Sequence, residues 1–231
     1  PSPVPMPVPG AAVLKAREAM VKELLRADYE LAKRSTAGQL SLAKKLLKCG
    51  IEEKGDAGAR YVCFAEAREA ALKAGDLGTV FEAIDAMAGS FIIDSLEMQR
   101  TALTIARRST REPAEWRDLH QRYGGIVDRA IDVDRYDLAI DLMGELTSSA
   151  ERSRDAGLVA SAKSKKKEIQ EIKAEYDRIK KDRDALSLDP GDSRARLAVG
   201  RFLCLLKDEW KKGLPLLAAG SENALRDLAK Q

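Results

Sequence analysis

The stretch that decides the fold is AREAALKAGDLGTVFEAIDAM, residues 67–87. Its first part is rich in alanine, a strong helix former whose small side chain lets two helices approach closely. Gly75 can take the left-handed conformation that ends a helix, and Asp76 can cap the helix that follows. The stretch therefore predicts a helix, a tight turn and a returning helix.

The same pattern extends outward from this hairpin in both directions. Apolar residues recur at spacings of three and four, as expected for one face of a helix, in residues 11–34, 40–51, 93–109, 116–131 and 136–146. No segment shows the period of two that is typical of a strand. The predicted fold class is all-α, built of stacked antiparallel helical hairpins.

The C-terminal third departs from a regular hairpin pattern. One long helix is expected from Ala156 to Leu186, with a length of about 45 Å at 1.5 Å per residue. Asp189 and Pro190 should end it, and a last hairpin should follow, in which Trp210 introduces the returning helix. From Ser221 onward we expect a C-terminal capping helix, because the end of a helical stack would otherwise expose its core.

The chain begins with PSPVPMPVPG, residues 1–10, and has no initiator methionine, which is what we expect of a fragment or a mature form. Alternating prolines favour polyproline II, so this segment is interpreted as a semi-rigid linker; a proline-rich ligand for another domain is the alternative. Residues 11–231 then form the helical domain, with a possible subdivision near residue 154.

Three stretches carry a resemblance to tetratricopeptide repeats, which are two-helix units of about 34 residues. They are residues 67–87, DRYDLAIDLMGEL (residues 134–146) and DPGDSRARLAVGRFL (residues 189–203). The resemblance implies a TPR-like α-solenoid in which small or aromatic residues fill the contacts between helices. The implied structural repeat positions are Ala71, Gly75, Tyr136, Ala139, Pro190, Gly200 and Trp210.

The C-terminal stretch LAVGRFLCLLKDEWKKGLPLLAAGS, residues 197–221, also resembles a TPR-like module that recurs in large planctomycete proteins. In those proteins the module has no assigned activity and lies beside linkers and extracytoplasmic domains. The resemblance therefore implies the fold rather than a particular function, and it favours a periplasmic or envelope location over the cytoplasm.

The charge pattern argues against nucleic acid as the partner. The chain has 40 Lys and Arg against 37 Asp and Glu, and the two signs are interleaved along almost every helix. The densest basic run, Lys163 to Lys167, is followed by several acids and is interpreted as a solvated helix face. No apolar stretch reaches the roughly 18 residues needed to cross a bilayer.

Residue types that carry common chemistry are scarce. The single histidine, His120, lies among charged residues in a helical pattern and is interpreted as structural rather than as a catalytic base. Cys49, Cys63 and Cys204 lack CxxC spacing and are expected to be buried thiols. Gly124 and Gly125 are interpreted as allowing a kink or a close helix crossing, because no phosphate-binding loop is present. No catalytic residue, cofactor or metal is predicted.

These observations favour a non-catalytic protein–protein interaction or scaffold module, with a protein or peptide, or a second copy of the chain, as its partner. The alternatives are a self-assembling structural subunit and an accessory region of a larger extracytoplasmic protein. A further hypothesis is an enzyme or carrier whose chemistry lies in a region outside this segment.

Overall fold

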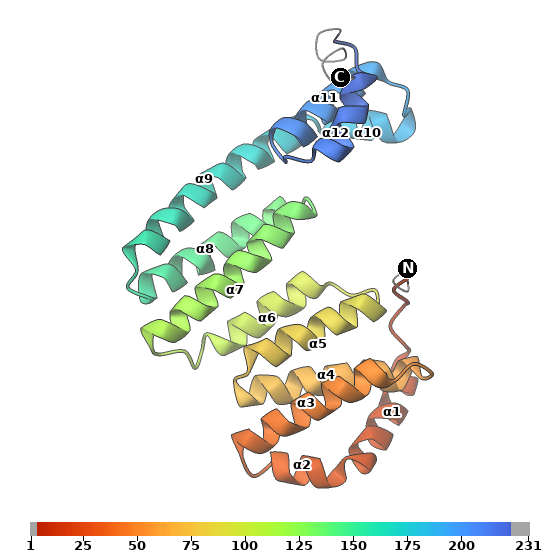
Figure 1. The fold of residues 1–231 in the computed structure, drawn as a ribbon, viewed down its shortest axis with the longest axis vertical. Helices are drawn as coiled ribbons and strands as arrows, with labels where there is room; N and C mark the ends of the chain where they lie inside the picture. The colour runs from red at the N-terminus through yellow and green to blue at the C-terminus, as the bar shows by residue number, and fades with distance from the viewer. Residues whose placement is uncertain (1–3, 223–231) are drawn as a thin grey trace.

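The computed structural model describes residues 4–222 of the chain, and this part is all-helical. Figure 1 shows an elongated, curved arrangement with the N-terminal helices at one end and the C-terminal helices at the other. Most helices pack mainly against the helices next to them in the sequence, whereas α1 packs mainly against α4. The twelve helices are α1 (Ala11–Leu24), α2 (Arg26–Ala32), α3 (Thr36–Glu52), α4 (Ala57–Ala74), α5 (Leu77–Ser90), α6 (Ser95–Ala106), α7 (Pro113–Asp132), α8 (Tyr136–Arg152), α9 (Ala156–Arg178), α10 (Lys180–Leu188), α11 (Ser193–Leu205) and α12 (Trp210–Ala218).

The turn between α4 and α5 forms as the sequence predicts. Gly75 is left-handed, with φ of +74°, and the Asp76 carboxylate accepts hydrogen bonds from the first backbone N–H groups of α5. Three other turns between helices place a residue other than glycine in the same left-handed conformation: Asp134, Arg154 and Asp208. The chain thus reverses direction four times through one kind of turn.

Two long helices of the sequence prediction are each interrupted by one residue. The helix expected over residues 11–34 changes direction at Leu25, and the long helix expected from Ala156 to Leu186 breaks at Ile179 into α9 and α10. The expectation of one uninterrupted helix was wrong in both places. The physical reason is packing, because the bend at Leu25 lays α2 against α3 and the bend at Ile179 lays α10 against α11 (Figure 1).

The buried apolar residues form two clusters that meet at α6. The first cluster is built from α1 to α5, and the second from α7, α8 and α9 together with Phe202 of α11. Ala102 of α6 faces the first cluster and Leu103 the second. Residue 154 lies in the turn between α8 and α9, which both contribute to the second cluster, so the division near residue 154 stays a prediction.

A buried polar group joins the two clusters. Gln99 of α6 is fully buried, and its side-chain amide donates to Asp85 of α5 over 2.8 Å while its oxygen accepts from Arg129 of α7. Both the nitrogen and the oxygen of the Gln99 side chain are therefore hydrogen-bonded, as is usual for buried polar groups. This arrangement fixes α5, α6 and α7 relative to one another.

The proline-rich segment is attached to the helices rather than projecting as a free spacer. The Met6 N–H donates to the Ser90 carbonyl over 3.0 Å, and the Ile92 N–H donates to the Met6 carbonyl over 2.8 Å. Met6 thereby forms an isolated parallel bridge with Phe91, at the connection between α5 and α6. The helical part begins at Ala11, as expected, but residues 4–10 are held at Met6 by backbone pairing that the proline pattern alone did not reveal.

The α11–α12 pair is in close contact through two glycines. A Cβ atom on Gly200 would lie 2.9 Å from the Leu217 side chain and 3.1 Å from the Leu217 nitrogen, and one on Gly213 would lie 2.3 Å from the Cys204 sulfur. Gly200 therefore occupies the close helix crossing that the sequence predicts. The expected capping helix from Ser221 falls almost entirely outside residues 4–222.

Candidate functional site

A cavity with a volume of about 600 Å³ lies where α7, α9 and the α11–α12 turn meet. Ile169 and Ile172 of α9, with Ile131 of α7 and Leu206, supply its apolar lining. A second cavity of about 530 Å³ lies further along α9 and shares Ile172, Leu206 and Glu168 with the first. We call the two together the α9 groove.

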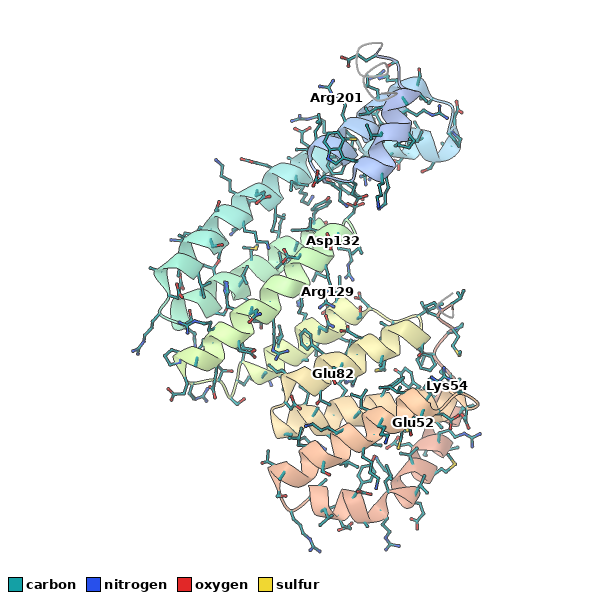
Figure 2. The ribbon with its side chains drawn as sticks, in the orientation of Figure 1. Glu52, Lys54, Glu82, Arg129, Asp132 and Arg201 are labelled. Atoms are coloured by element: carbon teal, nitrogen blue, oxygen red, sulfur yellow. The ribbon has the colours of Figure 1, made fainter. Side chains whose placement is uncertain are left out.

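Carboxylates line the α9 groove. They come from three elements and are Asp128 and Asp132 of α7, Glu168, Glu171 and Glu175 of α9, and Glu209 of the α11–α12 turn. Figure 2 shows Asp132 at the end of α7 that lies near the C-terminal helices. The groove thus combines an apolar floor with an acidic rim.

Lys207 holds the wall of the groove in place. Its side chain is only 6% exposed, and its ammonium donates to the Asp134 carboxylate over 2.7 Å and to the Asp132 carbonyl over 3.2 Å. The Glu209 carboxylate lies 3.2 Å away. Lys207 belongs to the α11–α12 turn, whereas Asp132 is the last residue of α7 and Asp134 lies in the α7–α8 turn. This contact therefore fastens the C-terminal hairpin to the rest of the molecule.

The electrostatics of this contact keep Lys207 charged. Burial lowers the pKa of Lys207, but the hydrogen bonds to Asp134 and Glu209 outweigh that effect, so the pKa lies above its ordinary value. A buried ammonium needs such partners, since an unpaired charge away from water is costly. The lysine is therefore a fixed part of the wall, and its charge is already compensated.

An aromatic row supports the same wall from inside. The Tyr136 ring lies 4.9 Å from that of Tyr176, which lies 5.7 Å from that of Phe202. The Arg183 guanidinium covers the Tyr176 ring at 3.2 Å. The row joins α8, α9 and α11 directly, and the Tyr136 hydroxyl donates to Asp134, the partner of Lys207.

The seven predicted repeat positions fall into three groups. Ala71, Tyr136, Ala139 and Gly200 are buried between helices, and Gly75 forms its left-handed turn. Pro190 is exposed in the turn between α10 and α11, and its carbonyl accepts from Arg196. Trp210 is 44% exposed at the start of α12. Of the seven, Tyr136 supports the groove wall, whereas Ala71 and Gly75 lie in the N-terminal half of the molecule.

The remaining candidates have structural surroundings. The His120 Nδ1 atom lies 3.0 Å from the Leu146 carbonyl oxygen, and Cys63 and Cys204 are buried while Cys49 is half-buried. No described helix crosses closely at Gly124 or Gly125, so the expectation of a close crossing was wrong. A Cβ on Gly124 would lie 3.8 Å from its nearest neighbour, and one on Gly125 would meet nothing within 4 Å. In residues 4–222 no cluster of metal-binding side chains was found, and no helix is long and apolar enough to cross a membrane.

A smaller cavity of about 390 Å³ lies among α1 to α4. Tyr29 is one of its lining residues, and its hydroxyl donates to Glu66 over 2.9 Å, while Lys22 lies 3.3 Å from the same carboxylate. These charges are compensated within the cavity.

Sequence reasoning missed Lys207, Asp134 and Gln99. No local pattern marks them, because Lys207 and Asp134 are 73 residues apart and Gln99 resembles any polar residue of an exposed helix face. Comparison of the chain with protein-family models, with curated proteins and with solved structures found no match.

Proposed function

We propose that the chain is a non-catalytic protein–protein interaction or scaffold module that binds a partner through the α9 groove. The observation that carries the proposal is the exposure of apolar side chains in that groove: Leu205 is 62% exposed and Leu206 is 42% exposed, beside the partly buried Ile172. Apolar residues grouped in a concave surface with a polar rim are typical of recognition sites.

The proposal includes a TPR-like architecture, related to the module of planctomycete proteins that the C-terminal stretch resembles. Packing between sequence neighbours and the recurring left-handed turns support it. The unequal lengths of the helices and the bends at Leu25 and Ile179 are departures from a regular array. Helical arrays of this kind commonly present a concave binding surface.

A photo-crosslinking experiment tests the proposal. The photoreactive residue benzoylphenylalanine replaces Leu205 in the groove or, as the control, Glu82, an exposed residue of α5 that Figure 2 shows in the N-terminal half. We expect an adduct with a second protein from an extract of the source cells at position 205 but not at position 82. The absence of an adduct specific to position 205 would refute the proposal, and so would binding of a small metabolite in the cavity in place of a protein.

The second candidate, a self-assembling structural subunit, predicts a different adduct. In that case Leu205 would crosslink to another copy of the chain, and light scattering would show a mass that rises with concentration. The same experiment therefore separates the two candidates.

A further inference from the structure

We propose that the α9 groove binds a basic amphipathic helix, which deepens the proposed function and rests on it. The inference comes from three properties of the groove: the charge of its rim, the apolar residues of its lining, and walls that are formed by helices and a turn rather than by a strand edge.

Among residues 4–222, part of the rim's negative charge has no compensating cation. In this part of the chain two lysines line the groove, Lys165 and Lys207. Lys165 pairs with Asp128, and Lys207 pairs with Asp134 and Glu209. Within residues 4–222, neither Asp132 nor Glu168 has an ion-pair partner. A partner that carries Lys or Arg at matching positions would complement this rim.

The remaining acids of α9 reinforce the same charge. Glu171 and Glu175 follow Glu168 at spacings of three and seven, and residues with these spacings lie along one helix face. Their own partners, Lys167 at 3.7 Å and Arg178, are largely exposed. Surface pairs of this kind contribute little stability, so a ligand can displace them at small cost. The exposed Lys163, Lys166 and Lys167 do not line the groove.

The floor requires apolar side chains on the ligand. Ile169 is fully buried, so the accessible apolar surface comes from the partly buried Ile172 and from the exposed Leu205 and Leu206. The groove follows α9 from Ser161 to Glu175, which is about 21 Å at 1.5 Å per residue. A helical ligand of about 14 residues matches that length, with its apolar residues three and four apart.

The backbone around the groove favours a helical ligand over an extended one. An extended peptide gains affinity by pairing with a strand edge. The groove is formed by helices and a turn, and the backbone of α9 is bonded within its own helix. A helix satisfies its own backbone groups and needs only side-chain contacts, which is the mode that this surface offers.

Binding of designed peptides tests the inference, with fluorescence anisotropy as the readout. The probe is a fluorescein-labelled peptide of leucine and lysine with leucines on one helix face. Two controls are a peptide of the same composition in scrambled order and a one-faced peptide of leucine and glutamate. We expect the one-faced lysine peptide to bind most tightly and the glutamate peptide to bind weakest.

Protein variants then locate the binding. Glu168→Lys should weaken binding of the lysine peptide about tenfold, since it replaces an attraction with a repulsion at the rim. The matched charge reversal Glu82→Lys should leave the affinity unchanged, and Leu205→Ser should weaken binding without any change of charge. Equal effects of Glu168→Lys and Glu82→Lys would overturn the inference, because binding would then follow net charge alone.

The result also separates this inference from the proposed function. If Leu205 crosslinks to a partner but the lysine peptide does not bind, the partner chemistry is wrong and the interaction site remains. If neither is observed, both proposals fail.

Discussion

The substitution Gly200→Leu probes the close contact between α11 and α12. A side chain at residue 200 would start 2.9 Å from the Leu217 side chain and 3.1 Å from the Leu217 backbone nitrogen. A flexible side chain can rotate away, but the backbone nitrogen moves only if α12 moves. Overpacking of this kind costs about 1 to 3 kcal/mol or more. Replacing glycine in a helix recovers up to about 1 kcal/mol through better helix propensity. We therefore expect a net loss of about 1 to 2 kcal/mol.

The assay is urea unfolding followed by circular dichroism and by tryptophan fluorescence. In a Trp116→Phe background the fluorescence comes from Trp210 at the start of α12, so it reports opening of the last hairpin. The matched control is Gly144→Ala on the exposed face of α8, where an added Cβ meets nothing within 4 Å. This control should gain about 0.5 to 1 kcal/mol from helix propensity alone. If Gly200→Leu is neutral or stabilising like the control, α11 and α12 are not in close contact and the reasoning is refuted.

Three further predictions concern the turns, the buried lysine and the thiols. Lys207→Met should lower the free energy of unfolding by about 1 to 3 kcal/mol, as it leaves partly buried carboxylates without their partner. The pKa of Lys207 in the folded protein lies above its ordinary value of 10.5, so its charge contributes fully to the free energy of unfolding below pH 10.5. As the pH rises further, that contribution is lost. The difference between wild type and variant in urea unfolding should then shrink. Arg154→Gly should stabilise the protein by about 0.5 to 1 kcal/mol, because it relieves the strain of a residue other than glycine in the left-handed conformation. Gly75→Ala should destabilise it by about 1 kcal/mol for the converse reason. Thermal unfolding measures both changes, and opposite signs would contradict the turn geometry. Burial raises the pKa of Cys63 to about 11, so a thiol reagent at pH 8 should label the half-buried Cys49 first; faster labelling of Cys63 would show that it is accessible.

The local structure of the chain could be predicted from sequence to a large extent. Gly75 and Asp76 act through neighbours a few residues away, and their turn and capping roles agree with the structure. The bends at Leu25 and Ile179 could not be predicted, because the helical pattern continues through both and neither glycine nor proline marks them. They result from contacts with α3 and α11, which a periodic pattern does not encode.

The candidate site was the least predictable part. Its walls come from α7, α9 and the α11–α12 turn, whose proximity depends on the bend at Ile179 and on the contact between Lys207 and Asp134. Glu168 was interpreted only as part of a solvated helix face. What separates it from Glu171 and Glu175 is that it lines both cavities and has no ion-pair partner within residues 4–222, and only the tertiary structure shows that.

The bridge between Met6 and Phe91 has a mechanical consequence. Tension applied to the chain on the N-terminal side of Met6 reaches the connection between α5 and α6 before it reaches α1, because Met6 is bonded to Ser90 and Ile92. The two hydrogen bonds must break before the load can unwind α1 from its end. A pulling force on this side is therefore borne first near the junction of the two cores, and the first helices are shielded from it.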